Sequence, residues 1–340
     1  MASMPAAEAP RWADAANPDA VDSPVMRTRR AHGTHRTGRH DMKALRIHAY
    51  GGPEVLQVDD VPMPRPAPGE ALVKVAATSF NPADVAIRTG AFAAVLPLSF
   101  PHTLGMDLAG TLVGDAGPGL LQGDPVVAFL PPNMAGAAAE YVAVPVALLA
   151  HAPATIPLIE AAGLPSTGTT AWQALFEHGD LVEGQRVLVN GGGTAVGGLA
   201  VQLAVAAGAE VDALAGPMSV ERVRGYGAEK VVDYTVRGAS EVEPGVYDLV
   251  VNLAPTPVAE LAPLVRAGGR LVSATTASEA ADDRITIVRM AAHPSRQVLE
   301  ELVTAVDAGR LHLHVTGARP LEDAAAVHVD RARGKTLLQP

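Results

Sequence analysis

The residues best suited to chemistry form a glycine-rich run from Gly191 to Gly197, with the sequence GGGTAVG. An apolar run at Arg186–Asn190 precedes it, and a helical pattern over about Val196–Ala207 follows it. Glycines let a backbone approach a ligand closely, and the N–H groups at a helix start attract phosphate. In this position the run predicts a dinucleotide-binding turn, with a purely structural turn as the alternative. The predicted cofactor-binding residues of the turn are Gly193, Thr194, Ala195, Val196 and Gly197.

The choice of nucleotide depends on the end of the next predicted strand, Glu210–Ala215. An acidic residue at that end would bind the ribose hydroxyls of NAD. The chain from Gly216 to Ser219 contains no acid, so no carboxylate there repels the 2′-phosphate of NADPH. Asp212 lies inside the strand and is interpreted as a solvent-facing residue. We therefore predict NADPH, with Gly216 and Ser219 near its adenosine end and Arg222 as the nearest cation.

The elements that must position these residues change in type along the chain. From Met42 to about residue 150, short β-type runs are separated by glycine and proline turns, which predicts a small β-rich domain. From about Glu160 onward, short apolar strands alternate with helices, which predicts a doubly wound parallel sheet. The predicted fold class is α/β, with a β-rich domain joined to a doubly wound dinucleotide-binding domain.

Composition excludes several classes of protein. The sequence contains no cysteine, so it has no disulfide framework, no thiolate nucleophile and no cysteine-ligated zinc. The net charge of -10 argues against nucleic-acid binding as the main function. No apolar run approaches the roughly 18 residues of a membrane span, so no membrane partner is expected. The simplest location for such a chain is the cytoplasm.

Residues 1–41 differ from the rest of the chain and are predicted to be a disordered leader. Their second part, Arg27 to His40, is basic and contains no acid. A basic arm could bind nucleic acid or an anionic surface, but a solvated tail or a start codon assigned too early is the simpler interpretation. Met42 reads as a fresh N-terminus.

Several short motifs, taken in order, carry a resemblance to a known family. They are Asn81-Pro-Ala-Asp84 with Arg88-Thr-Gly90, Leu104-Gly-Met-Asp-Leu-Ala-Gly110, Ala139-Glu-Tyr-Val142, Thr170-Ala-Trp-Gln-Ala-Leu175 and Val232-Asp-Tyr234. From Met42 to Leu338 the sequence resembles the zinc-independent quinone oxidoreductase branch of the medium-chain dehydrogenase/reductase superfamily. The resemblance implies a GroES-like catalytic domain at 42–165 with 309–340, and a Rossmann domain at 166–308.

The resemblance also implies the reaction, in which hydride passes from NADPH to a quinone or an α,β-unsaturated ketone. Asn81 is the implied catalytic residue, because its amide could hydrogen-bond the nicotinamide region or the substrate oxygen. Its structural alternative is a residue that begins a turn. Thr170 would lie beside the nicotinamide and Tyr234 beside the adenosine, with a buried threonine and a strand-end tyrosine as alternatives. The remaining implied cofactor contacts are Asn252, Leu253 and Ala274.

The sequence departs from its relatives at several positions. Zinc members of the superfamily have Gly-His-Glu where this chain has Gly105-Met106-Asp107, and they also carry a catalytic cysteine, so no metal is predicted. The other histidines are scattered and are interpreted as surface residues. Related reductases place a tyrosine at one of the positions that Val85 and Phe92 occupy here. Neither residue can donate a proton, so the proton is expected to come from water or from a quinone's own oxygen. A lysine common near the 2′-phosphate is Ser219 here.

Thr194 and Ala195 replace glycines of the family's usual turn, and the hydroxyl of Thr194 could either crowd the pyrophosphate or bond to it. Two alternatives to an ordinary reductase therefore stay open: a tailoring enone or enoyl reductase of a natural-product pathway, and a pseudoenzyme that has lost cofactor binding. The family also implies a homodimer that joins Rossmann edge strands, for which Arg270–Thr275 is the predicted edge. Loops at Ala91–Ser99 and Pro131–Ala138 are expected to line the substrate pocket.

Overall fold

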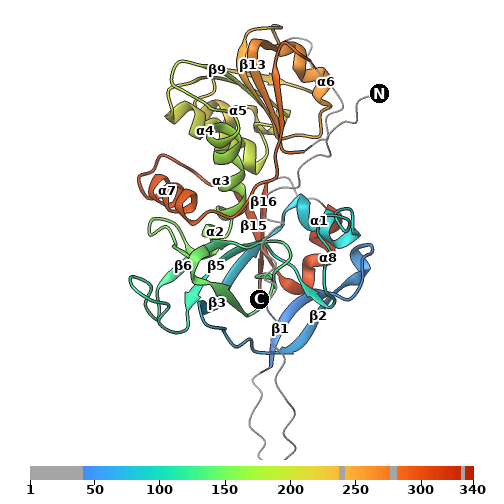
Figure 1. The fold of residues 1–340 in the computed structure, drawn as a ribbon, viewed down its shortest axis with the longest axis vertical. Helices are drawn as coiled ribbons and strands as arrows, with labels where there is room; N and C mark the ends of the chain where they lie inside the picture. Colours follow the sequence, from blue (N-terminus) through green and yellow to red (C-terminus); the bar gives the residue numbers. More distant parts are fainter. Residues whose placement is uncertain (1–40, 237–241, 276–281, 331–333) are drawn as a thin grey trace, which may run out of the picture. The chain divides into compact units, whose positions relative to one another are not determined.

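The computed structural model describes residues 41–236, 242–275, 282–330 and 334–340. The predicted leader, apart from Asp41, lies outside the described residues. Residues 40–340 form one compact unit. Its described residues form three sheets, of which one is parallel, one is antiparallel and one is mostly antiparallel. Figure 1 shows the fold.

The parallel sheet begins after residue 185 and confirms the predicted doubly wound fold. Within the described ranges it has six strands in the order β11-β10-β9-β12-β13-β14, and each neighbouring pair is parallel. In chain order this is 3-2-1-4-5-6, the arrangement of dinucleotide-binding sheets. The strands are β9 (Arg186–Asn190), β10 (Glu210–Ala215), β11 (Lys230–Asp233), β12 (Tyr247–Asn252), β13 (Val265–Ser273) and β14 (Thr286–Arg289).

Both faces of this sheet are covered, as the apolar character of its strands requires. Alternate residues of β9 point to opposite faces. Val187 and Val189 join the core formed with α3 (Pro165–Trp172), α4 (Ala195–Ala206), α5 (Val220–Gly225) and α7 (Arg296–Asp307), whereas Leu188 joins the core formed with α6 (Val258–Leu261). Figure 1 shows α4 and α5 on one side of the sheet and α6 on the other. The glycine-rich run leaves the central strand of this sheet.

The β-rich part contains a larger and a smaller sheet within the described residues. The larger has strands β3 (Glu70–Ser79), β5 (Asp107–Leu112), β6 (Pro125–Phe129), β7 (Tyr141–Pro145), β8 (Ala150–His151), β15 (Val315–Pro320) and β16 (Lys335–Gln339). The smaller has β1 (Asp41–Ile47), β2 (Leu56–Pro62) and β4 (His102–Thr103). The last strand returns to the first part of the chain, because β16 pairs with β3 through Leu337 opposite Ser79.

The helices are short, with local signals at their ends. They are α1 (Pro82–Thr89), α2 (Leu158–Ala161), α3 (Pro165–Trp172), α4 (Ala195–Ala206), α5 (Val220–Gly225), α6 (Val258–Leu261), α7 (Arg296–Asp307) and α8 (Ala324–Asp330). Helix α1 begins with Pro82 in its first turn and ends at Gly90, whose φ of 77° is left-handed. A π-helical turn, Gln173–Glu177, extends α3. No helix among the described residues is long and apolar enough to cross a membrane.

The predicted edge strand is wrong. Arg270 to Ser273 belong to β13, which is paired on both sides, with β12 and with β14. On this side of the sheet the outer strand is β14, and its four residues, TIVR, form a run too short to stand out as a strand in the sequence. The polar stretch Ala277–Asp283, which lies partly outside the described residues, gives no indication in the sequence that a strand follows it.

Candidate active site

A buried carboxylate, Asp107 at the start of β5, accepts hydrogen bonds from four residues. Its Oδ2 atom accepts from Ser79 Oγ, from Asn81 Nδ2 at 2.9 Å, from Ser166 Oγ at 2.9 Å and from Lys335 Nζ at 3.2 Å. Its Oδ1 atom accepts from the Ser166 N–H at 2.6 Å. We call these five residues the Asp107 network. Its carboxylate and ammonium groups form an ion pair inside the protein.

The network forms where five element ends meet. Ser79 ends β3, Asn81 precedes α1, Asp107 begins β5, Ser166 lies in the first turn of α3, and Lys335 begins β16. These elements come from distant parts of the chain, because 228 residues separate Asp107 from Lys335. The network therefore ties the β-rich sheet to α3, which packs in the same core as α4.

The side-chain amide of Asn81 is held in this network through its nitrogen and its oxygen. Its Oδ1 atom accepts from Lys335 Nζ at 2.6 Å. Ser166 Oγ lies 3.2 Å from the same atom, but its single proton is donated to Asp107, which is nearer at 2.9 Å. Its Nδ2 atom donates to Asp107 and, at 3.3 Å, to the Ser79 carbonyl oxygen. An asparagine amide has two donors and two acceptor positions, so both donors and one acceptor position are used within the protein. The predicted Thr170 lies next to the network, because its hydroxyl donates to the Ser166 carbonyl at 2.7 Å.

Asp84 adds a second buried carboxyl group beside Asn81. Its Oδ2 atom accepts from the backbone N–H of Asn81 at 2.8 Å, which caps the start of α1. Burial raises the pKa of Asp84 from 3.8 to about 7, although this hydrogen bond and the charge of Lys335 lower it, and the charge of Asp107 raises it further. Its Oδ1 atom is buried without a hydrogen-bond partner among the described residues. Near neutral pH this carboxyl group is therefore partly protonated.

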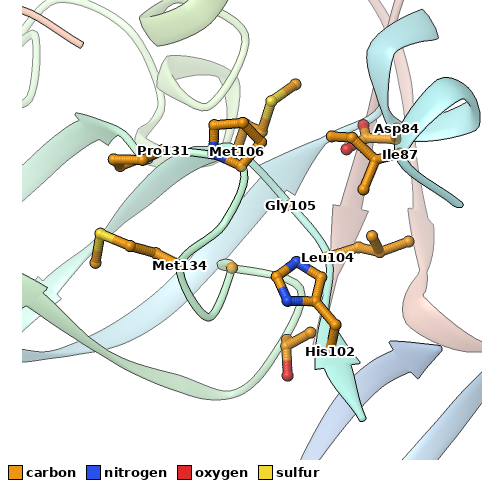
Figure 2. A pocket seen from close by; sticks show the side chains of 11 residues that line it. Asp84, Ile87, His102, Leu104, Gly105, Met106, Pro131 and Met134 are labelled. Carbon is orange, nitrogen blue, oxygen red and sulfur yellow. The ribbon is translucent and has the colours of Figure 1, made fainter. Parts of the chain in front are cut away.

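A small pocket opens next to Asp84, lined by side chains of α1, β4 and the segments that follow β4 and β6 (Figure 2). The predicted substrate-lining segment at residues 131–138 supplies Pro131, Pro132, Met134 and Gly136 to it. The space open to water there is about 10 Å³, enough for about one water molecule.

His102 also lines this pocket, and burial lowers its pKa. The interpretation of the histidines as surface residues is wrong for His102 and for His328, which are 6% and 4% exposed. Single histidines inside short apolar runs look the same in sequence whether they face a core or solvent.

Hydrogen bonds to strand β10 and to the Thr194 side chain hold the glycine-rich turn. The N–H groups of Gly191 and Gly192 donate to the Leu214 carbonyl at 3.1 and 2.9 Å. Thr194 caps α4: its hydroxyl accepts from the Gly197 N–H at 2.9 Å and donates to the Gly191 carbonyl at 2.8 Å. The Thr194 hydroxyl therefore stabilises the turn and has its proton committed there. The N–H groups of Ala195 and Val196, at the start of α4, have no intrahelical acceptor and suit a phosphate.

The predicted adenosine-end residues lie together where β10 and β11 end. A Cβ atom at Gly193 would lie 2.4 Å from Ser219 Oγ, and one at Gly216 would lie 3.3 Å from Tyr234 Oη. Arg222 lies beside them, because its Nη2 atom donates to the Gly193 carbonyl at 3.1 Å. The Nη1 atom of Arg222 is buried without a hydrogen-bond partner among the described residues. The structure thus brings a guanidinium group next to the turn.

The other predicted cofactor contacts lie at the ends of β12 and β13. Leu253 donates its N–H to the Asn190 carbonyl at 2.9 Å, and Ala274 donates to the Asn252 carbonyl at 3.1 Å. The side chains of Asn190 and Asn252 are joined by a 2.8 Å hydrogen bond. The predicted residues therefore form two groups, one around Asp107 and one along the carboxyl edge of the parallel sheet.

Sequence reasoning did not assign Asp107, Lys335, Ser79 or Ser166 to the site. Asp107 and Lys335 could have been identified from the sequence, because each is an isolated charge at the start of an apolar strand. The interpretation of Asp212 as solvent-facing is wrong, because its Oδ2 atom accepts from Tyr247 Oη at 2.7 Å and from Arg186 Nη2 at 3.1 Å, and the residue is buried. Arg186 lies on β9, which is next to β10, and Tyr247 lies on β12, on the other side of β9. Only the fold brings these strands together.

Two family descriptions match the chain, "Alcohol dehydrogenase GroES-like domain" over residues 67–154 and "Zinc-binding dehydrogenase" over residues 226–338. The chain is 34% identical over 325 residues to the chloroplast envelope quinone oxidoreductase homolog of Arabidopsis thaliana, covering 88% of this chain and 98% of that protein. It is 31% identical over 318 residues to the NADPH-dependent alkenal/one oxidoreductase of the same plant, covering 88% and 80%. The quinone oxidoreductase of Coxiella burnetii has a TM-score of 0.79 and 25% identity, covering 88% and 99%.

The residues present do not fit the zinc of the second description. The chain has no cysteine, and Met106 and Asp107 stand where the zinc members have His-Glu. Asp107 is already bonded to the Lys335 ammonium group. No group of three His, Asp or Glu side chains in the described ranges is placed to hold a metal ion. On its fold and its relatives, the chain belongs to the medium-chain dehydrogenase/reductase superfamily, in its quinone oxidoreductase branch.

Proposed function

We propose that this protein is an NADPH-dependent reductase that transfers hydride to a quinone or an α,β-unsaturated ketone without a metal. The observation that carries the proposal is the Gly191–Gly197 turn between β9 and α4, at the point where the strand order of the sheet reverses. Ligands of doubly wound sheets bind at this point, and the start of α4 is suited to a pyrophosphate. The names of the relatives, a quinone oxidoreductase homolog and an alkenal/one oxidoreductase, support the same substrate class.

The preference for NADPH rests on charge at the end of β10. No carboxylate follows that strand between Gly216 and Ser219, and the guanidinium group of Arg222 lies beside Gly193. A guanidinium group binds a phosphate well, whereas the NAD-binding carboxylate of other members would repel it. The proposed cofactor contacts are those predicted from the sequence, with Arg222 added.

An apolar substrate is supported by the segment after α1. Phe92, Val95 and Phe100 are 44%, 69% and 38% exposed. The ring of Phe100 also packs edge-on against Tyr50, with 4.8 Å between ring centroids. These side chains provide apolar surface against which a quinone ring or an enone chain could pack.

The bound nicotinamide would supply the hydride. The protein would hold the pyrophosphate at the start of α4, keep Asn81 and Thr170 in place through the Asp107 network, and exclude water with the apolar segment. The proton of the product would come from water or from the quinone itself.

The test is a rate measurement. Purified protein is mixed with NADPH and a panel of simple quinones and enones, and the absorbance of NADPH is followed with NADH as the comparison. Consumption of NADPH that depends on both protein and acceptor supports the proposal. If no acceptor is reduced, titration of the melting temperature with NADPH separates the alternatives, since a ligand of the folded state must raise it. No shift at millimolar NADPH would favour a pseudoenzyme.

Three further predictions belong to the same proposal. The domain limits are 42–165 with 309–340 for the catalytic domain and 166–308 for the Rossmann domain. A homodimer is supported by the outer strand β14, which pairs on one side only, with β13, within the described residues. Sedimentation of the purified chain distinguishes a dimer from a monomer. A cytoplasmic location agrees with the lack of cysteine, and fractionation of cells tests it.

A further inference from the structure

Lys335, which sequence analysis did not assign to the site, is hydrogen-bonded to Asn81, which it did assign. Lys335 is 4% exposed, and its ammonium group lies 2.6 Å from Asn81 Oδ1 and 3.2 Å from Asp107 Oδ2. A buried ammonium group is costly unless it is paired and hydrogen-bonded. Here it has both a counter-charge and a neutral acceptor.

The pair gives the Asn81 amide only one favourable orientation. The amide oxygen faces the ammonium group, and the amide nitrogen, at 2.9 Å, faces the carboxylate of Asp107. Rotation of the amide by 180° would place N–H groups against an ammonium group and an oxygen against a carboxylate. Both contacts would be repulsive in a buried site, where charges interact strongly.

The same pair fixes the start of α3. The carboxylate of Asp107 accepts both the N–H and the hydroxyl of Ser166, at 2.6 and 2.9 Å. One turn later on this helix is Thr170, which donates to the Ser166 carbonyl. Displacement of Asp107 would therefore move Asn81 and the helix that carries Thr170 together.

We propose that Lys335, through its ion pair with Asp107, is a positioning residue of the reductase site that holds the Asn81 amide and the start of α3 in one arrangement. This inference rests on the proposed reductase function. It assigns no contact between Lys335 and the substrate. Its effect is expected in kcat, because small displacements of positioning groups reduce the rate of the reacting complex more than its formation.

The test compares Lys335→Met, which keeps the length of the side chain and removes its charge, with Lys74→Met on the exposed side of β3 as a control. Both substitutions, Lys335→Met and Lys74→Met, are also made in the Asn81→Ala variant. In the native background Lys335→Met is expected to lower kcat on the order of tenfold or more, with the KM for NADPH changed by less than about threefold. In the Asn81→Ala background the same change is expected to cost less than about twofold, because its target is absent.

Two results would overturn the proposal. One is a folded Lys335→Met variant that keeps kcat within about twofold of the native value. The other is an equal loss of kcat with and without Asn81, which would mean that Lys335 acts independently of it. If the unpaired carboxylate prevents folding, the variant Lys335→Met with Asp107→Asn removes both charges, and the same two comparisons are made with it.

A second readout separates this inference from the reductase proposal. The side-chain N–H signals of Asn81 are identified in the nitrogen-15 spectrum by their loss in Asn81→Ala. Their exchange with solvent is expected to accelerate at least about tenfold in Lys335→Met and not in Lys74→Met, because the amide loses its fixed partners. Unchanged exchange overturns the inference even if the protein reduces no quinone, whereas accelerated exchange without reductase activity rejects only the proposed function.

Discussion

The Nζ atom of Lys335 lies 2.6 Å from the Oδ1 atom of Asn81, although 254 residues separate the two in the chain. The contact exists because β16, the last strand, pairs with β3, whose end leads directly into Asn81. The final residues of the chain are thus part of the site that the first half of the chain provides. Variants of the C-terminal strand should therefore alter catalysis as well as stability.

Gly197 should tolerate no side chain. A Cβ atom there would lie 2.0 Å from the Gly191 carbonyl oxygen, which is backbone and cannot move aside cheaply. We expect Gly197→Ala to raise the KM for NADPH at least about tenfold, equivalent to about 1.4 kcal/mol of lost binding. Gly114→Ala is the matched control, since a Cβ atom at Gly114 would meet no atom within 4 Å. Equal KM values for the two variants would show that the turn does not bind the cofactor.

Arg222 should discriminate between the two nucleotides. Its Nη1 atom is buried without a partner in the described part of the chain, and its Nη2 atom is bonded to the turn at Gly193. If this guanidinium group binds the 2′-phosphate, Arg222→Met should weaken NADPH binding about 10-fold to 100-fold and NADH binding much less. Titration calorimetry with both nucleotides measures this. The same loss for NADPH and NADH would mean that Arg222 only supports the turn.

Asp84 should make the protein less stable as pH rises. Its pKa is 3.8 when unfolded and about 7 when folded, so the folded state binds more protons between these values. The free energy of unfolding therefore falls as pH rises from about 4 to 7, by an amount on the order of a few kcal/mol. Asp84→Asn keeps an acceptor for the Asn81 N–H and removes the charge.

We expect Asp84→Asn to be more stable than the native protein at pH 8 and to lose this advantage near pH 4. Denaturant unfolding at several pH values measures the difference, with the exposed Asp283→Asn as control. A difference that does not vary with pH would contradict the buried-carboxyl account. The groups facing Asp84 are the Asn81 N–H and the charges of Asp107 and Lys335, which the substitution leaves in place.

His328 should make the protein less stable as pH falls, which is the opposite of the effect of Asp84. Burial, and then the charge of Arg88, lowers its pKa from 6.5 to about 4. The unfolded state binds more protons between these values, so stability is lost as pH falls from about 6.5 to 4. His328→Phe keeps an aromatic ring against Phe80, whose centroid is 4.9 Å from that of His328. We expect this variant to resist acid better than the native protein in pH-dependent unfolding, and the exposed His312→Phe to show no such gain.

The parts of the fold with a local signal were predictable from the sequence. The Gly191–Gly197 run, the strand before it and the helix after it follow from residue type and spacing, and the structure confirms this arrangement. The Asn81-Pro82 pair marks the start of helix α1, as the structural alternative for Asn81 predicted. Each of these features depends on residues within one turn or one strand. The catalytic role of Asn81 came from the family resemblance and stays a prediction.

The features that the sequence did not predict depend mainly on contacts between distant segments of the chain. The Asp107–Lys335 pair needs β16 to return to β3, and no spacing rule connects residues 228 positions apart. Asp212 was misread for the same reason, since Tyr247 Oη reaches it from another strand of the sheet. The outer strand β14 was missed because it has only four residues, TIVR, of which two are apolar, and this run is too short to show a period.

The most direct test of the account is the rate of NADPH consumption by the purified native protein with a simple quinone or enone, measured beside Gly197→Ala. We expect the native protein to consume NADPH only when an acceptor is present, and Gly197→Ala to need a much higher NADPH concentration to reach half its maximal rate. No consumption by the native protein with any acceptor, or the same NADPH dependence for both proteins, would contradict it.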